Sequence, residues 1–298
     1  MANHLLNTFC PRIDFDSYED FAENFRIDVP ENFNFAYDVV DEWARVEPDK
    51  RALLWCDDHD NERTFTFTDI SRLSNRMANS FSAMGIGKGD VVMCILRRRW
   101  EYWVTAVALC KIGATIIPAT LQLTKKDIVY RAQSAHVKAM VCVDDDYVCG
   151  EVEKALPESP SIESIIVAGG TREGWTSYES LLEEGSEDWV RPAGDKATKN
   201  SDIMLIYFTS GTTGMAKAVC HSFVHPLGHI ITAKYWQQVQ EDRLHMSVSD
   251  SGWAKFGWGK IYGQWICGAT VFAYDMDKFV PAKLLQKIQD YKLTTFCA

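Results

Sequence analysis

The feature that most constrains the fold is an alternation of short apolar runs with helix-periodic segments between residues 68 and 143. Residues 91–96, 115–118 and 139–143 are apolar runs with the length of buried strands. Segments of helical character flank or separate them, at 68–85, at 101–111 and from residue 124 onward. Strands and helices that alternate at this spacing predict a parallel sheet covered by helices on both faces, so we expect an α/β fold.

Side chains at the ends of these segments indicate where the helices begin and end. Thr68 is expected to cap the first helix and Gly85 to end it. Gly113 breaks the pattern of the second helix. Thr124, with Asp127 three residues later, has the spacing of a capping box at the start of the third helix.

The pattern divides the chain into two parts. Residues 1–67 open with an acidic, irregular stretch, and we predict that this segment wraps the surface of the rest. Residues 68–298 form the predicted α/β domain. Within it, the polar, turn-rich stretch 171–200 is expected to be a surface connection.

Charge and cysteine content limit the partners and the compartment. The 298 residues include 31 basic and 41 acidic side chains, a formal net charge of −10, which gives no reason to expect a nucleic acid or an anionic membrane as partner. The nine cysteines show no CxxC spacing, which indicates reduced thiols. No apolar run reaches the roughly 18 residues of a membrane span, and no signal-peptide pattern opens the chain. We expect a cytoplasmic protein, and a homo-oligomer is compatible with the sequence.

A strand followed by a loop of hydroxyls and glycines carries the clearest chemical signal. Residues 203–208 have the pattern of a buried strand and run into Thr209-Ser210-Gly211-Thr212-Thr213-Gly214-Met215-Ala216-Lys217. Glycines let backbone N–H groups turn toward one point, hydroxyls add neutral donors, and the lysine adds a positive charge. The combination predicts a polyphosphate-binding loop; the alternative is a hydroxyl-rich hairpin turn without a ligand.

This loop does not have the spacing of a Walker A motif, which places Gly-Lys-Ser/Thr at its end and opens a helix. The fifth residue after Gly211 is Ala216, and Lys217 is followed by alanine. Residues 218–220 have the pattern of a short strand, before Ser222 caps a helix. We therefore expect a strand-loop-strand hairpin and not a P-loop kinase or GTPase.

Residues 209–217 closely resemble the signature phosphate loop of the adenylate-forming superfamily, which comprises acyl-CoA synthetases, peptide-synthetase adenylation domains and firefly luciferase. Alanine stands at position 216, where that signature usually has proline. Four further segments resemble the medium-chain acyl-CoA synthetase branch: 37–48, 96–103, 113–130 and 250–270. The resemblance implies parallel sheets flanked by helices, as an incomplete N-terminal domain of the adenylate-forming fold.

The resemblance also implies ATP-dependent activation of a carboxylic acid. The acid attacks the α-phosphorus of ATP to give acyl-adenylate and pyrophosphate, and the thiol of CoA then displaces AMP to give a thioester. The loop would hold the leaving pyrophosphate with Mg²⁺, which is an electrostatic role and not an acid–base one. The implied phosphate-binding residues are Thr209, Ser210, Gly211, Thr212, Thr213, Gly214 and Lys217.

The same resemblance places an acyl pocket in the aromatic stretch after residue 250, although a core role for these rings competes with it. The implied pocket residues are Trp253, Ala254, Phe256 and Gly257. In the family, the adenine contacts, a magnesium-binding glutamate and the lysine of a mobile C-terminal domain lie downstream of residue 298. We therefore assign no catalytic residue here and expect that this chain does not turn over by itself.

Two other clusters allow further interpretations. Arg97 and Arg99 follow a strand end, where ligands bind in open α/β sheets, and they could contact the phosphates of CoA. A solvated charged turn is the alternative. His221, His225 and His229 lie four apart and could share one helical face. No acidic or cysteine ligand completes a zinc set, so we expect pocket lining or helix packing and no metal.

Related functions stay open at this point. An aryl-CoA ligase or a peptide-synthetase adenylation domain would share the adenylation step and differ in the acid or the acceptor. From another class, a non-catalytic chain could keep the nucleotide- and acyl-binding fold without the downstream motifs.

Overall fold

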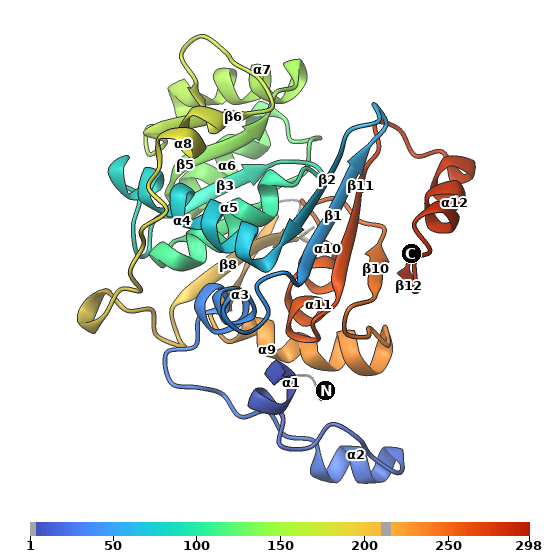
Figure 1. Ribbon diagram of the computed structural model, residues 1–298. Coiled ribbons are helices and arrows are strands. Elements are labelled where there is room, and N and C mark those ends of the chain that lie inside the picture. Colours follow the sequence, from blue (N-terminus) through green and yellow to red (C-terminus); the bar gives the residue numbers. More distant parts are fainter. Residues whose placement is uncertain (1–3, 210–215) are drawn as a thin grey trace.

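The protein folds around two β-sheets, in a computed structural model that describes residues 4–209 and 216–298 (Figure 1). The larger sheet has the strand order β7-β6-β5-β3-β4-β8-β9, and the smaller has the order β12-β10-β11-β1-β2. Neighbouring strands are parallel except for the edge pairs β8–β9 and β1–β2, which are antiparallel. The predicted α/β class with parallel sheets is thus confirmed.

The strands of the larger sheet are β3 (Val91–Ile95), β4 (Thr115–Pro118), β5 (Val137–Val143), β6 (Ser164–Ala168), β7 (Thr176–Ser177), β8 (Ile203–Thr209) and β9 (Lys217–Ser222). Those of the smaller sheet are β1 (Arg51–Asp57), β2 (Glu62–Thr66), β10 (Leu244–Ser247), β11 (Thr270–Asp275) and β12 (Thr295–Cys297). Every apolar run that we predicted to be a strand lies in the larger sheet.

The helices fall into layers on either side of these sheets. Helices α6 (Lys125–Ala135) and α7 (Asp146–Ala155) cover the outer face of the larger sheet. Helices α4 (Phe67–Ala83), α5 (Glu101–Ile112) and α8 (Tyr178–Glu184) contribute to the core between the two sheets. Helix α12 (Pro281–Asp290) packs on the outer face of the smaller sheet (Figure 1). The remaining helical segments are α1 (His4–Phe9), α2 (Tyr18–Asn24), η1 (Ala36–Asp41), α3 (Glu42–Val46), η2 (Leu156–Glu158), η3 (Gly194–Lys196), α9 (His225–Ile230), η4 (Ile231–Trp236), α10 (Ala254–Lys260) and α11 (Tyr262–Ile266).

Side chains that alternate along each strand produce these layers. In β3, Val92 and Cys94 join the core between the sheets, whereas Met93 and Ile95 join the core under α6 and α7. A strand turns successive side chains to opposite faces, so an unbroken apolar run is what a sheet buried on both faces requires. Every residue of α5 is buried, which agrees with its place in the central layer.

The predicted helix ends are partly correct. Thr124 and Asp127 form the capping box of α6, and Gly113 caps α5 with a φ of 74°. The cap of α4 was placed wrongly: Thr66 is the N-cap and forms a capping box with Asp69. The hydroxyl of Thr68 instead donates to the carbonyl of Pro48.

Several elements were not predicted from the sequence. Residues 51–66, within the predicted N-terminal segment 1–67, form β1 and β2 of the smaller sheet. The stretch 171–200 contains β7 and α8 besides its turns. Helices α1 and α2 lie below the sheets in Figure 1, where Phe21 and Phe25 pack on Tyr235 of η4.

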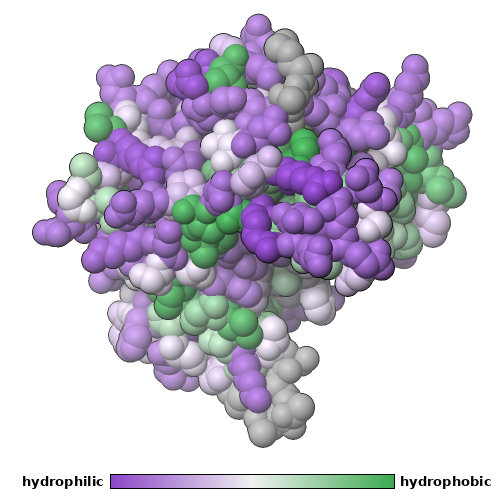
Figure 2. All heavy atoms as spheres, turned by 90° about the horizontal axis from the view of Figure 1, so that it is seen from below, coloured by the Kyte–Doolittle hydropathy of each residue, from purple (hydrophilic) through white to green (hydrophobic). Residues whose placement is uncertain are grey.

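The face seen in Figure 2 is largely hydrophilic, with several separate hydrophobic patches. Among the described residues, no helix has both the length and the apolar character needed to cross a bilayer. None of the nine cysteines, all of which are among the described residues, forms a disulfide, and Cys220 is the exposed one among them.

Candidate functional site

The predicted phosphate loop connects β8 to β9. These strands pair antiparallel, and Thr209 lies opposite Lys217 in the last pair of the ladder. The predicted strand-loop-strand hairpin is therefore confirmed. Both residues are exposed, and Lys217 forms no ion pair with any described residue. The other predicted phosphate contacts, Ser210, Gly211, Thr212, Thr213 and Gly214, lie outside the described residues.

Helix α6 holds the end of this hairpin. The hydroxyl of Tyr130 donates to the carbonyl of Ala216 at 2.8 Å, one residue before Lys217. The ring of Tyr130 also meets Phe208 edge to face, and the guanidinium of Arg131 lies 5.1 Å from the centre of the Phe208 ring. The end of β8 and the start of β9 are thus held against α6, which covers the outer face of the same sheet.

The four predicted acyl-pocket residues lie at the start of α10. Trp253 is its N-cap and is 62% exposed, and Ala254 is exposed as well. Phe256 is fully buried between the rings of Tyr102 and Trp103, so it fills the core. Gly257 is buried against β8.

Strand β8 brings the hairpin and α10 together. A Cβ on Gly257 would lie 2.5 Å from the hydroxyl oxygen of Tyr207, so a larger residue there would require the Tyr207 ring to shift. Tyr207 and Thr209 are two residues apart on one strand, and their side chains therefore share a face, about 7 Å apart. The end of the hairpin and the start of α10 are neighbours on that face.

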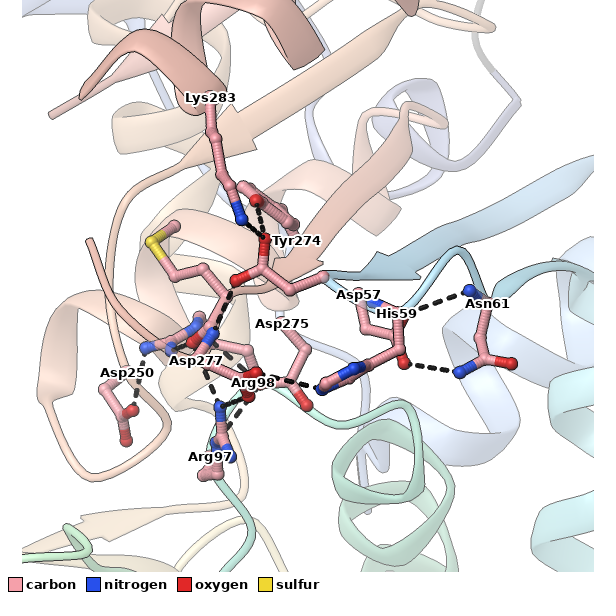
Figure 3. A network of polar contacts seen from close by, with 12 residues as sticks. Asp57, His59, Asn61, Arg97, Arg98, Asp250, Tyr274, Asp275, Asp277 and Lys283 are labelled. Atoms are coloured by element: carbon pink, nitrogen blue, oxygen red, sulfur yellow. Dashed lines mark hydrogen bonds and ion pairs between the residues drawn. The ribbon is translucent and has the colours of Figure 1, made fainter. Parts of the chain in front are cut away.

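An ion-pair network holds residues 249–253, the turn that leads into α10 (Figure 3). The guanidinium of Arg98 donates to Asp250 at 3.0 Å and to the carbonyl of Met276 at 2.6 Å. Arg97 accepts a hydrogen bond at its carbonyl from the amide of Ser251 at 3.3 Å. The carboxyl ends of β3 and β11 are thereby tied to the turn after β10.

Burial sets the electrostatics of this network. The carboxylate of Asp275 lies 3.3 Å from Arg97 and 3.9 Å from Arg98 and is largely enclosed. Burial raises the pKa of Asp275, and the guanidinium groups lower it in part. The amine of Lys260 is fully buried and donates to the carbonyl of Ser249 at 3.2 Å. Burial, followed by the charge of Arg98, lowers the pKa of Lys260 to about 7.

The arginines that we predicted to contact CoA are both ion-paired in this structure. Arg97 contacts Asp275 and Asp277, and Arg99 pairs with Glu101, whose side chain is fully enclosed. The alternative prediction, a solvated charged turn, does not describe these arginines either, because both are paired with carboxylates. A phosphate at either guanidinium would compete with carboxylates that are already in place.

The three predicted histidines gather beside Tyr207. His221 lies on β9 and not on a helix, so the expected common helical face is wrong, and α9 begins without a side-chain cap from Ser222. The rings are nevertheless in contact: the centres of His221 and His225 are 4.1 Å apart, and the Nε2 atoms of His225 and His229 are 3.1 Å apart.

Three carboxylates elsewhere approach closely enough to suggest a cation site. Those of Glu47, Glu241 and Asp242 lie together, in the segments that precede β1 and β10. The amine of Lys50 lies among them, at 3.2, 2.9 and 2.7 Å respectively, and 4.5 Å from the ring centre of Trp43. Lysine therefore already supplies the positive charge at this position.

Two features escaped the sequence analysis. Nothing in the run of three arginines distinguishes Arg98, the member that contacts Asp250. Tyr207 and Tyr262 are 55 residues apart in the sequence, and the fold brings both against Gly257. The one signal in the sequence is Tyr207, which places a polar hydroxyl inside an otherwise apolar strand.

Two largely parallel sheets flanked by helices, with a hairpin whose connecting sequence is rich in hydroxyls and glycines, are the features of an α/β protein of the adenylate-forming class. Residues 40–298 match the model of the family described as AMP-binding enzyme, and the chain belongs to this family.

The individual relatives are acyl-CoA synthetases and a related ligase. The chain is 34% identical over 305 aligned positions to acyl-coenzyme A synthetase ACSM3, mitochondrial, of Homo sapiens, which covers all of the chain and 51% of that protein. It is 33% identical to the ACSM4 protein of Homo sapiens, over 91% of the chain and 47% of that protein. The chain thus spans about half the length of the curated relatives it matches.

A solved structure supports the fold. The anthranilate CoA ligase AuaEII, determined in complex with anthranoyl-AMP, aligns with a TM-score of 0.80 over 90% of this chain and 50% of its own. Its sequence identity is 20%, so the likeness concerns the fold alone.

Proposed function

We propose that this chain supplies the phosphate-binding hairpin and the acid pocket for ATP-dependent activation of a carboxylic acid to an acyl-adenylate, with transfer to CoA as the second step. The observation that carries the proposal is the position of the hairpin. Its last residue pair, Thr209 and Lys217, stands on the same strand face as Tyr207, which packs against Gly257 of the predicted acyl pocket. A polyphosphate and a carboxylate held at these two places would be neighbours, as adenylation requires.

Charge supports this assignment. Lys217 is an exposed cation without a carboxylate partner among the described residues. It is therefore available to a polyphosphate, and Mg²⁺ would share the neutralisation of the leaving pyrophosphate. The side chains of the loop, Thr209 to Lys217, would act by binding and not by proton transfer.

Direct titration tests the phosphate half of the proposal. We expect magnesium pyrophosphate to bind the wild-type chain in calorimetry, and Lys217→Ala to weaken it at least about tenfold, because one close charge is lost. Lys199→Ala, a charge change outside the hairpin, is the control. Equal affinities of the wild type and Lys217→Ala would contradict the proposal.

Turnover is a separate question. We expect no CoA-dependent release of pyrophosphate by the 298 residues alone, because they span 51% of the length of the human ACSM3 protein. Measurable release with ATP, Mg²⁺, an acid and CoA would refute this expectation while supporting the activity itself. Release with an acid but no thioester with CoA would favour the adenylation-domain alternative, and preference for ring acids would favour an aryl-CoA ligase.

The compartment stays a prediction. The printed names of the two human relatives include the word mitochondrial, which applies to those proteins. Localisation of a fluorescently tagged chain would test the cytoplasmic prediction.

A further inference from the structure

A pocket lies at the end of the larger sheet opposite to the phosphate hairpin. Asp90, which directly precedes β3, is part of its wall, whereas the hairpin follows the carboxyl end of β8. The hydroxyl of Thr115, at the start of β4, donates to the carbonyl of Ile203, at the start of β8, so the amino ends of β3, β4 and β8 lie together. A strand of seven residues, about 20 Å long, therefore separates the pocket from the hairpin.

This pocket has the volume and the apolar wall of a small-molecule site. Its volume is about 640 Å³, within the range of roughly 300–1,000 Å³ that is usual for ligand pockets. One side is the turn between α4 and β3, and the other is the segment 186–197, which we call the strap. The apolar side chains of the wall are Ile86, Ile112, Trp189, Val190 and Pro192. All but one are aliphatic, so the wall suits an aliphatic chain.

Two positions show that this wall is uncovered. Val190 of the strap is 86% exposed, although the neighbouring Trp189 packs against the core between the sheets. A Cβ built on Gly87 meets no atom within 4 Å, so open space lies beside that glycine as well. A ligand that removes this apolar surface from water would gain free energy in proportion to the area covered.

The strap is held in place by the protein itself. The side-chain amide of Asn79 donates to the carbonyls of Ser186 and Asp188 at 2.8 and 2.9 Å. The indole of Trp189 donates to the hydroxyl of Tyr37 at 2.8 Å. The pocket is thus preformed, and a ligand need not order the strap in order to bind.

One cation in the wall has no partner. The charged side chains of the wall are those of Lys88, Asp90 and Lys196. The amine of Lys88 lies 3.1 Å from Asp202, and the carboxylate of Asp90 lies 3.0 Å from Lys138, so both are neutralised. Lys196 is exposed and forms no ion pair with any residue in the described part of the chain. The pocket therefore has one unbalanced positive charge beside its apolar wall.

We propose that this pocket is a second small-molecule site, which binds a single aliphatic chain that ends in one anionic group. The chain would lie on Ile86, Ile112 and Val190, and the anionic group, a carboxylate or a phosphate, would pair with the amine of Lys196. The site is independent of the proposed function, because about 20 Å of β8 separate it from the hairpin. Its wall joins segments that are distant in sequence, so a ligand there would stabilise the folded chain by mass action.

Titration followed by ¹H–¹⁵N NMR, with four eight-carbon compounds below their micelle concentrations, tests this site. The compounds are octanoate, octyl phosphate, 1-octanol and octylammonium. They are titrated into the wild type, Lys196→Ala, and Gly87→Leu, which extends a side chain into the open space. Lys278→Ala removes an exposed lysine after β11 and is the control for charge; Gly228→Leu, where a Cβ also meets no atom within 4 Å, is the control for size. Urea unfolding midpoints verify that each variant folds.

We expect the two anions to shift the amides of Gly87, Val190 and Lys196, and to bind about three- to fivefold more tightly than octanol, because an exposed ion pair contributes modestly. Octylammonium should bind more weakly than octanol. Affinities are taken from these amides, so that binding of octanoate elsewhere does not enter. Tighter binding of either anion identifies the anionic group and supports the site.

The variants separate the two parts of the site. Lys196→Ala should remove the preference for anions and leave the binding of octanol unchanged. Gly87→Leu should weaken every compound at least about tenfold, because leucine occupies the space of the chain, whereas both controls should bind as the wild type does. Equal affinities for anions and octanol, anion shifts confined to other parts of the chain, or wild-type binding by Gly87→Leu would overturn the inference and leave the proposed function standing.

Discussion

Arg98→Met removes the guanidinium that joins two strand ends to the turn before α10. In the structure this side chain donates to Asp250 at 3.0 Å and to the carbonyl of Met276 at 2.6 Å. Its side chain is 16% exposed, and that of Asp250 is 20% exposed. Methionine keeps much of the apolar stem and loses both hydrogen bonds, so the change isolates the polar contacts.

The expected loss follows from these contacts. A hydrogen bond to a charged group contributes about 1.5–3 kcal/mol, and one to a neutral carbonyl contributes about 1 kcal/mol. The partial exposure of the pair lets water solvate Asp250 after the change, so the lower part of that range applies. We expect Arg98→Met to reduce the free energy of unfolding by about 2–3 kcal/mol, which corresponds to a drop in Tm of roughly 3–5 °C for a chain of this size.

Urea unfolding followed by circular dichroism measures this loss. Arg45→Met removes an exposed guanidinium from a surface pair with Glu42 and is the matched control, whose midpoint should not move. Adding Asp250→Asn to Arg98→Met should restore part of the lost stability, because it removes the unpaired carboxylate. An unfolding free energy for Arg98→Met within about 0.5 kcal/mol of the wild type would refute the assigned role of this network.

Two further predictions concern the same region. Acid should destabilise the fold through the buried pair His225 and His229. The ordinary pKa near 6.5 of an unfolded histidine exceeds the folded values of about 3 for His225 and about 4 for His229, so the unfolded chain binds more protons than the folded chain. Stability should therefore fall as pH falls from about 6.5 toward 4. Urea midpoints at pH 7, 5.5 and 4.5 check this, and an identical pH slope in the His225→Leu/His229→Leu variant would contradict it. Gly252→Ala should cost about 1–3 kcal/mol, because the new methyl would meet the backbone of Thr120, whereas Gly228→Ala meets no atom within 4 Å and is the control. Equal unfolding midpoints for the two variants would contradict this contact.

The larger sheet could be predicted from the sequence because its strands are buried on both faces. Runs such as 91–96 and 203–208 are apolar at successive positions, which marks them without reference to their partners. Strand β2 could not be predicted in this way, because three of its five residues are exposed and it has no apolar run. Strand β1 opens with an exposed arginine, and its place in the smaller sheet depends on pairing with β11, more than 200 residues away.

The candidate site divides in a similar way. The hairpin was predictable because hydroxyls, glycines and a lysine are adjacent in sequence, so local chemistry was sufficient. The pairing of Arg98 with Asp250 and the contact of Tyr207 with Gly257 each join residues that are distant in sequence. Their existence depends on how β3, β8 and the turn before α10 converge, which spacing along the chain does not reveal. The helix cap is a smaller error. Thr66 and Thr68 are both possible N-caps of α4, and the capping box with Asp69, three residues after Thr66, identifies Thr66.

Chemical-shift mapping by ¹H–¹⁵N NMR tests most directly the claim that polyphosphate and acid sites adjoin on β8. Two titrations of the labelled chain are compared, one with magnesium pyrophosphate and one with a carboxylic acid. We expect pyrophosphate to shift the amides of Thr209 and Lys217, and the acid to shift those of Tyr207, Tyr262 and Gly257. Shifts from pyrophosphate that centre on another part of the sheet, or acid shifts remote from α10, would contradict the assignment.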